Sequence, residues 1–251
     1  MTLDRKVVVL TGGSRGIGRA CVLHAVAAGA CVVFCSRSDG PESREVEAAA
    51  ARLGGTGTAL GIAADVSREA DVIRLFDTAR RRFGAVHCAV NNAAVIHDQL
   101  LVSATTEAWD AVIETNLTGG FLVAREAIRA FRVQRSGGRI VAIGSPSQGG
   151  ASGNASYAVS KGGLEGLTRD ISRQHAHAGV VSNMVIPGYV VTALSSGMSE
   201  SSQRALIDGC PMRRAGSPDE IASVVVYLLS DAAGVDGQTI FVSGGLREVL
   251  L

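Results

Sequence analysis

The chain has 251 residues, of which 47% are hydrophobic and only 4% aromatic, and its formal net charge is +1. A core of this composition consists mainly of Val, Leu, Ile and Ala, and the near-neutral charge gives no global electrostatic argument for binding nucleic acid. The sequence has no run of about 18 apolar residues for a membrane span, and its charged start leaves no room for a signal peptide, so we expect a soluble, cytoplasmic protein.

Seven strand-like runs alternate with helical patterns along the chain. The runs cover residues 6–10, 30–35, 58–63, 85–90, 138–143, 180–186 and 238–242. This alternation predicts an α/β fold, with a doubly wound parallel sheet, helices on both faces and right-handed crossovers. No proline- or serine-rich linker interrupts it, so residues 1–251 are expected to form a single domain.

A glycine-rich turn follows the first strand. The buried run Val7–Leu10 leads directly into Thr11-Gly-Gly-Ser-Arg-Gly-Ile-Gly18, and a helical pattern from Ala20 to Ala28 comes next. Glycines allow the backbone to approach a pyrophosphate, whose charge is met by free N–H groups at the helix start. The turn therefore predicts the dinucleotide-binding loop of such a fold. It lacks the Gly-Lys-Ser/Thr ending of an NTPase loop, which disfavours ATP or GTP hydrolysis.

The end of the second strand indicates the choice of cofactor. The run Cys31-Val-Val-Phe-Cys-Ser-Arg-Ser38 places Ser36 where an NAD-binding chain carries an acid, and Arg37 follows directly. Arg15, inside the glycine turn, is a second cation. Either arginine alone is more often a solvated surface residue. Both together, with the acid missing, favour the 2′-phosphate of NADP(H), and Asp39 lies beyond the expected contact position.

The predicted topology brings several segments to one edge of the sheet. The carboxyl ends of the strands carry Gly12, Asp65, Asn91, Ser145 and Pro187, which places the cofactor site there. Residues 189–211, rich in Ser and Gly, are interpreted as a mobile lid over the substrate. The sequence Ser217-Pro-Asp-Glu220 then predicts a capping box that starts the next helix.

A tyrosine and a lysine lie four residues apart, with a serine upstream. On a helix, Tyr157 and Lys161 share one face, so a cation lies beside a phenol that water alone would leave protonated up to about pH 10. Such a phenol can donate and accept a proton at working pH. The spacing by itself is common on helix surfaces.

As an ordered set, these motifs resemble those of the classical short-chain dehydrogenase/reductases over essentially the whole chain. The set comprises Thr11-Gly-x-x-x-Gly-x-Gly18, Asn91-Asn-Ala-Ala94, Asn116, Ser145, Tyr157-x-x-x-Lys161 and Pro187-Gly188 with Thr192. The resemblance implies a Rossmann-type fold and hydride transfer to a carbonyl without a metal. The alkoxide formed in that step must be protonated.

The resemblance also assigns catalytic roles. Tyr157 would be the general acid, Lys161 would lower its pKa and hold the nicotinamide ribose, and Ser145 would orient the carbonyl. Asn116 would hold a water that links Lys161 to solvent, or else be a polar residue that bends or caps a helix. The connection from Ser145 to Tyr157 is one residue shorter than is usual in the family, and Ser147 is the alternative serine.

The cofactor contacts implied by the resemblance lie along the same edge. They comprise Gly12, Ser14, Arg15, Gly16, Ile17, Gly18, Ser36, Arg37, Asp65, Val66, Asn92, Ala93, Tyr157, Lys161, Pro187, Gly188, Val190 and Thr192. Asp65 and Val66 would lie along the adenine, and Asn91 would hold the neighbouring strand. Ala94 departs from the family's glycine and adds a methyl group near the cofactor.

The segment Asp98–Leu101, followed by Trp109–Leu117, resembles 3-oxoacyl-acyl-carrier-protein reductases. Arg125, Arg129 and Arg132 form a stripe that could dock an acidic acyl carrier protein, although a solvated face or a subunit contact explains it equally well. We therefore favour NADPH-dependent reduction of a 3-oxoacyl thioester or a polyketide-like ketone. The alternatives are an NADP-dependent alcohol dehydrogenase of a sugar, polyol or steroid, and a nonenzymatic dinucleotide-binding protein.

The remaining reactive residues predict no further site. The five cysteines are odd in number, and neither they nor the five histidines have the spacing of a disulfide framework or a metal site. The resemblance implies a homotetramer formed through helices at roughly 105–132 and 156–177. Burial of Val249, Leu250 and Leu251 against another subunit would cover an apolar carboxyl end.

Overall fold

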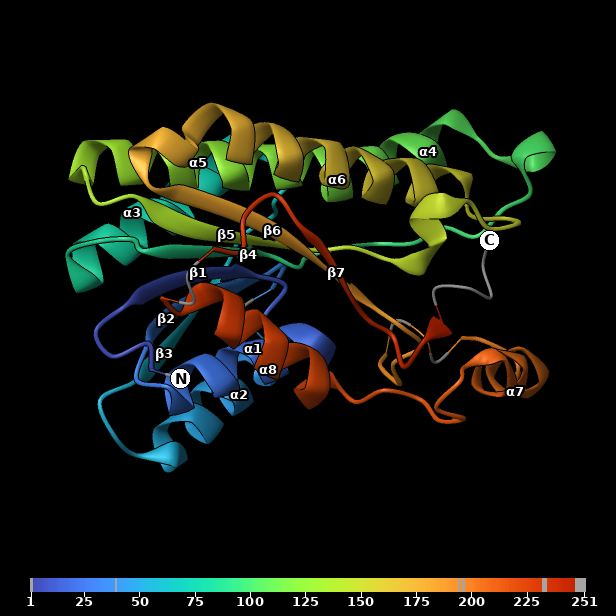
Figure 1. Cartoon of the computed structure of the whole chain (residues 1–251), viewed down its shortest axis with the longest axis horizontal. Coiled ribbons are helices and arrows are strands. Elements are labelled where there is room, and N and C mark those ends of the chain that lie inside the picture. The colour runs from blue at the N-terminus through green and yellow to red at the C-terminus, as the bar shows by residue number, and fades with distance from the viewer. Residues whose placement is uncertain (1, 39, 194, 196, 232–233, 247–251) are drawn as a thin grey trace.

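The computed structural model describes residues 2–38, 40–193, 195, 197–231 and 234–246. Seven parallel strands form one sheet in the order β3-β2-β1-β4-β5-β6-β7 (Figure 1). The strands are β1 (Val7–Thr11), β2 (Cys31–Ser36), β3 (Thr58–Ala63), β4 (Cys88–Asn91), β5 (Gly138–Ile143), β6 (Val180–Pro187) and β7 (Thr239–Val242). The predicted α/β fold and its seven strands are confirmed. The largest shift is at β4, which starts three residues later than predicted.

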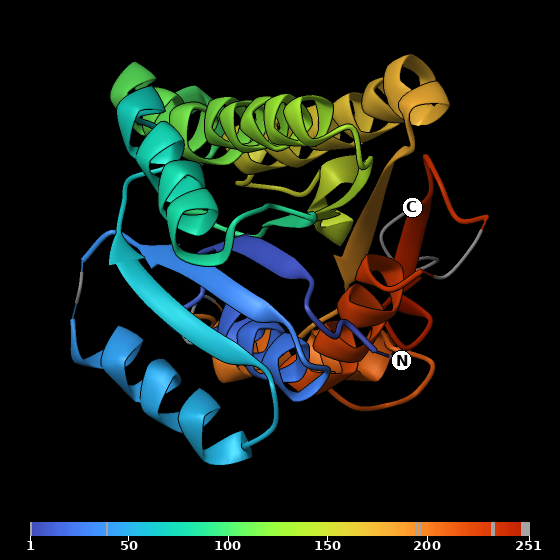
Figure 2. The same cartoon turned by 90° about the vertical axis from the view of Figure 1, so that its left-hand side faces the viewer.

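Helices cover both faces of the sheet (Figure 2). One layer contains α1 (Gly16–Ala27), α2 (Pro41–Leu53) and α8 (Pro218–Leu229); the other contains α3 (Glu69–Phe83), α5 (Gly119–Gln134) and α6 (Ala155–His175). The chain leaves the β3 edge through α3 and resumes at β4, beside β1. The order of the strands therefore reverses between β1 and β4, which is where doubly wound sheets bind dinucleotides.

Alternating side chains of the central strands build two separate cores. Val8 and Leu10 of β1 pack under α1 and α8, whereas Val7 and Val9 pack under α3 and α5. A strand buried on both faces needs apolar residues at every position, and this explains the continuous valine-rich runs. All five cysteines are free, and Cys31 and Cys35 lie on the same face of β2.

The long helix expected near 105–132 is present, and it contains a π-helical turn. Thr105 caps α4 (Thr106–Val112), a π-helical turn (η2, Ile113–Thr118) follows, and α5 begins at Gly119. The start of α5 packs unusually closely against the end of β4, because a Cβ on Gly120 would lie 2.4 Å from the Asn91 side-chain nitrogen. π-helical turns inside α-helices occur frequently at functional sites. The sequence pattern did not indicate this one.

The segment after β6 differs from the packed layers. It carries the short helix α7 (Glu200–Gly209), none of whose residues is fully buried, and α7 stands apart at the right of Figure 1. The capping box predicted at Ser217 and Glu220 is present at the start of α8. Among the described residues, no helix has the length and apolarity that crossing a membrane requires.

Candidate active site

The glycine turn packs so tightly that Gly12 and Gly18 leave no room for a side chain. A Cβ on Gly18 would lie 2.0 Å from the Gly12 carbonyl oxygen and 2.5 Å from the Asn92 side-chain nitrogen. Gly12 and Gly16 have φ of +68° and +54°, in the left-handed region that favours glycine. The turn therefore offers bare backbone at the start of α1, next to Ser14, Arg15 and Ile17.

Thr11 and Asn92 join this turn to the end of β4. The Thr11 hydroxyl accepts hydrogen bonds from the backbone N–H groups of Asn92 and Ala93, both at 3.1 Å. The Asn92 side-chain amide donates to the carbonyl oxygens of Thr11 at 2.9 Å and Gly12 at 3.0 Å. Thr11 is completely buried. We did not predict it as a site residue from the sequence, although it is the first residue of the glycine motif and could have been found from that position.

The predicted adenosine end of the site is rich in hydroxyl groups. The Ser36 hydroxyl donates to the Ser38 carbonyl oxygen at 2.7 Å and lies 2.9 Å from the Ser43 hydroxyl. Arg15 lies in the glycine turn and Arg37 directly follows β2, and both side chains are exposed. Asp39 lies outside the described residues.

One acid at this end was missed by the sequence analysis. The Ser14 hydroxyl donates to the Glu42 carboxylate at 3.4 Å, so Glu42 of α2 reaches the glycine turn. At the end of β3, the Asp65 carboxylate accepts from the N–H and hydroxyl of Ser67 at 3.0 and 2.7 Å, and Val66 is buried.

The segment after β6 closes over the glycine turn. Gly188 packs against Ser243, where a Cβ would lie 2.7 Å from the Ser243 Cα. Val190 forms a parallel bridge with Gly216, and Thr192 is the nearest group to Gly16, where a Cβ would lie 3.4 Å from the Thr192 methyl carbon. The structure therefore brings together Pro187, Gly188, Val190, Thr192 and the first half of the sheet.

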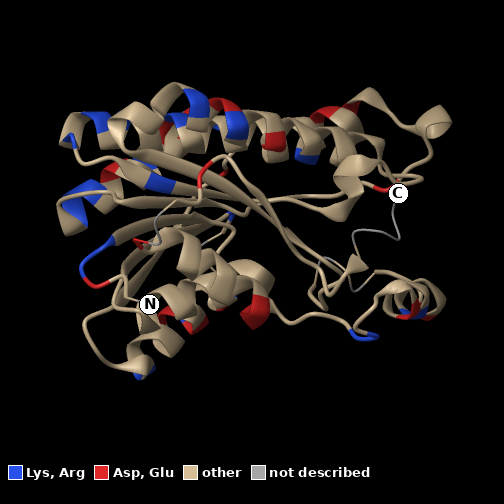
Figure 3. Ribbon diagram, in the orientation of Figure 1, with Lys and Arg blue, Asp and Glu red and all other residues tan. Residues whose placement is uncertain are grey.

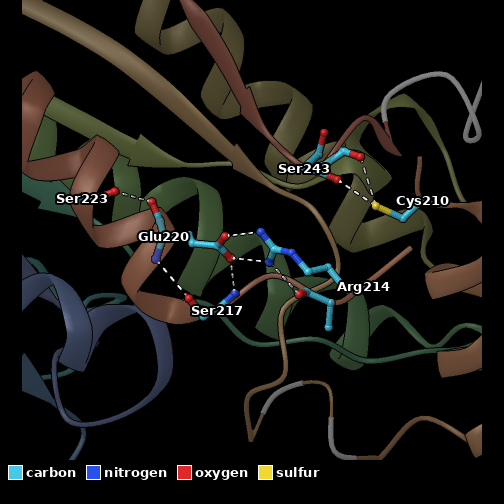
Figure 4. Close-up of polar contacts among 8 residues, drawn as sticks. Cys210, Arg214, Ser217, Glu220, Ser223 and Ser243 are labelled. Carbon is cyan, nitrogen blue, oxygen red and sulfur yellow. Dashed lines mark hydrogen bonds and ion pairs between the residues drawn. The ribbon is translucent and has the colours of Figure 1, made fainter. Parts of the chain in front are cut away.

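The far end of the predicted lid is anchored to α8 (Figure 4). The Arg214 guanidinium donates to both carboxylate oxygens of Glu220, at 2.6 and 3.0 Å, and the Ser217 N–H donates to the same carboxylate at 2.8 Å. Hydrogen bonds from Arg214 and then from Ser217 lower the pKa of Glu220 to about 2. The Cys210 thiol also donates to the Gly244 carbonyl oxygen at 3.1 Å.

Three of the four predicted catalytic groups lie together and are almost fully buried. Ser145, at the end of β5, is 9% exposed, while Tyr157 and Lys161 of α6 are 8% and 2% exposed. The Ser145 hydroxyl is close enough to the Tyr157 phenol to lower the pKa of that phenol. The Lys161 ammonium donates to the Ile143 carbonyl oxygen at 2.7 Å and lies 5.7 Å from the centre of the Tyr157 ring. Ser145, rather than the alternative Ser147, therefore reaches the tyrosine.

Burial dominates the electrostatics of this group. Burial raises the pKa of Tyr157, the hydrogen bond from Ser145 opposes the rise, and the negative charge of Asp98 adds to it. Burial also lowers the pKa of Lys161 to about 8. We expected Lys161 to lower the pKa of Tyr157. In this structure the ammonium donates to the Ile143 carbonyl oxygen and the phenol is removed from water, so that role of Lys161 stays a prediction.

Asn116 ties the π-helical turn to both neighbouring elements. Its side-chain oxygen accepts from the Val95 N–H at 2.9 Å, and its side-chain nitrogen donates to the Val95 carbonyl oxygen at 2.9 Å and to the Ser160 hydroxyl at 3.2 Å. Ser160 in turn donates to the Tyr157 carbonyl oxygen at 2.7 Å. The expected hold on a water remains a prediction. Ser160 was not singled out from the sequence.

The site residues lie apart from a cavity of about 670 Å³. That cavity is lined by residues of α6, by the turn after Ser145 and by the start of β7, and none of the predicted catalytic or cofactor-binding residues is among its lining residues. Within the described ranges, no group of three His, Cys, Asp or Glu side chains could hold a metal ion. The arrangement can thus deliver a proton from a buried phenol beside a dinucleotide-binding turn.

Comparison with known proteins agrees with this arrangement. The family model described as Enoyl-(Acyl carrier protein) reductase matches residues 12–247. The chain is 35% identical to the 3-oxoacyl-(acyl-carrier-protein) reductase FabG of Escherichia coli (strain K12), over 99% of this chain and 100% of that protein. It is 36% identical to the enzyme of the same name from Pseudomonas aeruginosa, over 98% of this chain and 99% of that protein.

Two solved structures resemble the chain over 98% of its length. Levodione reductase has a TM-score of 0.93 and 30% sequence identity, with 98% of that chain covered. The 3-ketoacyl-(acyl-carrier-protein) reductase from Brucella melitensis complexed with NADH has a TM-score of 0.89 and 28% identity, with all of that chain covered.

Proposed function

Because the chain belongs to the short-chain dehydrogenase/reductase family and is an oxidoreductase, we propose that it is an NADPH-dependent ketoreductase. It reduces a ketone to a secondary alcohol, with Tyr157 as the proton donor. The single observation that carries this proposal is the burial of Ser145, Tyr157 and Lys161 in one group, with the Lys161 ammonium 5.7 Å from the centre of the Tyr157 ring.

The residues at the carboxyl edge of the sheet fit a nicotinamide dinucleotide. A Cβ on Gly12 or Gly18 would collide with Asn92 or with the turn itself, so these glycines keep the turn tight, and the start of α1 supplies free N–H groups for a pyrophosphate. Asp65 and Val66 would flank the adenine, and the segment from Pro187 to Thr192 would cover the nicotinamide end. When bound, the reduced cofactor supplies a hydride to the carbonyl carbon.

The side chains around Tyr157 divide the remaining work. The phenol donates its proton to the carbonyl oxygen, where negative charge develops as the hydride arrives. The Ser145 hydroxyl orients that oxygen and lowers the pKa of the phenol. Lys161 supplies a buried cation that stabilises the developing negative charge and binds the nicotinamide ribose. Burial of the whole set excludes water from the reacting oxygen.

The preference for NADP(H) rests on the charges near Ser36. Arg15 and Arg37 meet the 2′-phosphate, and Ser36 leaves room for it. The Glu42 carboxylate, which accepts a hydrogen bond from Ser14, works against the phosphate, so the preference is expected to be moderate. Replacing Ser36 with Asp and Arg37 with Ala should turn the preference toward NAD(H). A wild-type enzyme that used NADH as well as NADPH would contradict the argument from charge.

A 3-oxoacyl thioester, carried by an acyl carrier protein, is the substrate that the named relatives favour. Levodione reductase has a similar structure, which makes a free ketone the second candidate. Oxidation of a sugar, polyol or steroid, and dinucleotide binding without catalysis, are the more distant alternatives. The last is disfavoured because a pure binder has no need of Asn116, Ser145, Tyr157 and Lys161 together.

A panel of ketones assayed with NADPH tests the function directly. The panel should contain carrier-linked and pantetheine-linked 3-oxoacyl chains, free diketones, and steroid and sugar ketones, with oxidation of the matching alcohols in parallel. Turnover of the thioesters with the highest kcat/KM supports the proposal. Turnover of free ketones alone would select the second candidate. NADPH binding without turnover of any member would select the dinucleotide-binding protein.

The enzyme is further proposed to be a homotetramer that pairs through α5 and α6. Exposed apolar side chains on these helices support the contact: Phe121 and Val133 on α5 and Val159 on α6 are 44%, 76% and 50% exposed. Val249, Leu250 and Leu251, which we expected at a subunit contact, lie outside the described residues. Light scattering at micromolar concentration tests the assembly, and a stable monomer would reject it.

A further inference from the structure

The connection between Ser145 and Tyr157 poses a structural problem. It is one residue shorter than is usual in the family, yet the Ser145 hydroxyl still lowers the pKa of the Tyr157 phenol. The turn itself is short: Ser145 caps a 3-10 turn, Pro146–Gly149, by accepting from the Ser147 N–H at 3.2 Å. From the last residue of the turn onward the chain is loosely packed, because a Cβ added to Gly149, Gly150 or Gly153 would meet nothing within 4 Å. The turn lies against α6, because a Cβ on Gly162 would be 3.7 Å from the Gln148 carbonyl oxygen, and its side chains can fix it there.

The side chain of Gln148 connects this turn to α6. Its amide nitrogen donates a hydrogen bond to the Glu165 carboxylate. Its amide oxygen is buried without a hydrogen-bond partner and points toward Gly144. Only the NH₂ group can face a carboxylate, so the contact with Glu165 fixes the orientation of the amide even though its oxygen is left unpaired. Leaving a buried acceptor unpaired is costly, and its retention here argues that the contact to Glu165 matters.

Glu165 is itself held from two further sides. Its second carboxylate oxygen accepts from the Thr239 hydroxyl of β7 at 2.9 Å and from the Arg169 guanidinium. Glu165 follows Tyr157 and Lys161 at successive intervals of four on α6, so it continues the catalytic face of the helix. The contacts form a strut that runs from β7 through Glu165 and Gln148 to the turn that begins at Ser145.

We propose that Gln148 and Glu165 are positioning residues that hold the shortened turn against α6 and so keep the Ser145 hydroxyl on the Tyr157 phenol. Neither touches the reacting atoms. Gln148 acts through the three-residue link back to Ser145, whose carbonyl oxygen also accepts from the Gln148 N–H at 3.1 Å. The inference rests on the proposed function for its kinetic consequences, but its structural consequence, the environment of Tyr157, does not depend on any substrate.

The first test is a double-mutant cycle between Gln148→Ala and Ser145→Ala. In the wild-type background, Gln148→Ala should lower kcat about tenfold through misplacement of a catalytic group, with the KM for NADPH nearly unchanged. In the Ser145→Ala background the same change should have almost no further effect, because the group that it positions is gone. Equal losses of kcat in both backgrounds would overturn the proposal.

A second readout needs no turnover. The protein has three tyrosines, so ultraviolet titration of each variant against its Tyr157→Phe counterpart isolates the Tyr157 phenol. Because Ser145 lowers the pKa of Tyr157, loss of the strut should move the titration to higher pH, in the same direction as Ser145→Ala does. An unshifted titration in Gln148→Ala would refute the role whether or not the enzyme reduces ketones.

Matched controls separate positioning from general stability. On the same helix, the Gln174 amide donates to the Asp170 carboxylate at 2.8 Å on the exposed face, so Gln174→Ala removes an equivalent contact that does not reach the Ser145 turn. It should leave both kcat and the Tyr157 titration unchanged. Glu165→Gln keeps an amide oxygen for Gln148 and should lose less activity than Glu165→Ala. A loss of Tm in Gln148→Ala without a change in the Tyr157 titration would mark a purely structural contact.

Discussion

Helices α5 and α6 lie side by side on the same face of the sheet (Figures 1 and 3), yet the polar residues in the first turns of α6 and the arginines of α5 have opposite environments. On α6, Tyr157, Ser160 and Lys161 are buried. On α5, the Arg125 guanidinium pairs with Glu69 and Glu126, the Arg129 guanidinium pairs with Glu126, and Arg129 and Arg132 are exposed. Both helices display ionisable residues at helical spacing. The comparison teaches that burial, rather than spacing, separates chemistry from surface charge.

The energetic reason is the cost of removing a charge from water. An exposed arginine keeps its hydration, so its ion pairs contribute little to stability. A buried ammonium gives up its hydration. In the described part of the chain Lys161 forms no ion pair; its ammonium donates to the Ile143 carbonyl oxygen and lies over the Tyr157 ring. A protein retains so costly a group where the group has a function. The predictions below test this contrast between the two helices.

The largest effect is expected for Tyr157→Phe. Removing the transferable proton should lower kcat by about 10²- to 10⁴-fold while NADPH binding is retained, because the ring and its packing remain. Steady-state rates and a fluorescence titration with NADPH measure the two quantities. The matched control is Tyr227→Phe on α8, where the tyrosine is 42% exposed. This variant should keep the kcat and the NADPH affinity of the wild type. Substantial turnover by a folded Tyr157→Phe enzyme would remove the proposed mechanism.

Asn116, which connects the π-helical turn before α5 to Ser160 of α6, is expected to have the next effect. Asn116→Ala leaves the N–H and carbonyl of Val95 without their partners, so the free energy of unfolding should fall by about 3 kcal/mol. Urea denaturation measures this change. If Asn116 also holds a relay water, kcat per folded enzyme falls as well. Unchanged stability would show that the three hydrogen bonds of Asn116 contribute little.

The buried charge of Lys161 predicts a pH dependence of stability. Burial lowers the pKa of Lys161 from 10.5 to about 8, so between these values the unfolded chain binds more protons than the folded protein. The free energy of unfolding should therefore rise as the pH increases from about 8 toward 10.5, with a contribution of about 3 kcal/mol.

The variant Lys161→Met sharpens this prediction. It should be more stable than wild type at pH 7 and should lack the rise, while NADPH affinity and turnover both fall, since the lysine serves both. Urea denaturation at pH 7 and pH 9.5 compares the two proteins. A wild-type stability that does not rise relative to Lys161→Met over this interval would contradict the buried charge.

The smallest effect is expected on α5. Arg132 is exposed and, among the described ion pairs, it appears in none, so it is the arginine of the stripe with most charge available for an acidic carrier. Arg132→Glu should raise the KM for a carrier-linked 3-oxoacyl substrate about threefold and leave a pantetheine-linked one unchanged, because rim charges act mainly on encounter. Equal changes for both substrates would exclude docking at this stripe.

Much of the fold could be predicted because its signals are local. Buried parallel strands require unbroken apolar runs, as in Val7–Leu10, and the capping box at Ser217 and Glu220 needs only residues three apart. The order of these segments predicted the edge at which Gly12, Asn92, Ser145 and Pro187 meet, because parallel strands all end on the same side.

The parts that could not be predicted depend on contacts between distant segments. The π-helical turn at Ile113–Thr118 is tied down by Val95 and Ser160, and Glu42 reaches the glycine turn from another helix. The raised pKa of Tyr157 follows from its burial, which no spacing along α6 reveals. The same is true of the strut through Gln148 and Glu165, whose members lie 17 residues apart.

The sequence by itself therefore determined the class of fold, the family and the identity of the groups that carry the proposed chemistry, since backbone geometry and periodicity are properties of neighbouring residues. Tertiary structure decided how those groups behave. It buried Lys161 and left Arg132 in water, and it directed the Lys161 ammonium to Ile143 and brought the Ser145 hydroxyl to Tyr157. The physical reason is that hydration and pKa depend on the whole surroundings of a group, which form only when the layers of the fold pack together.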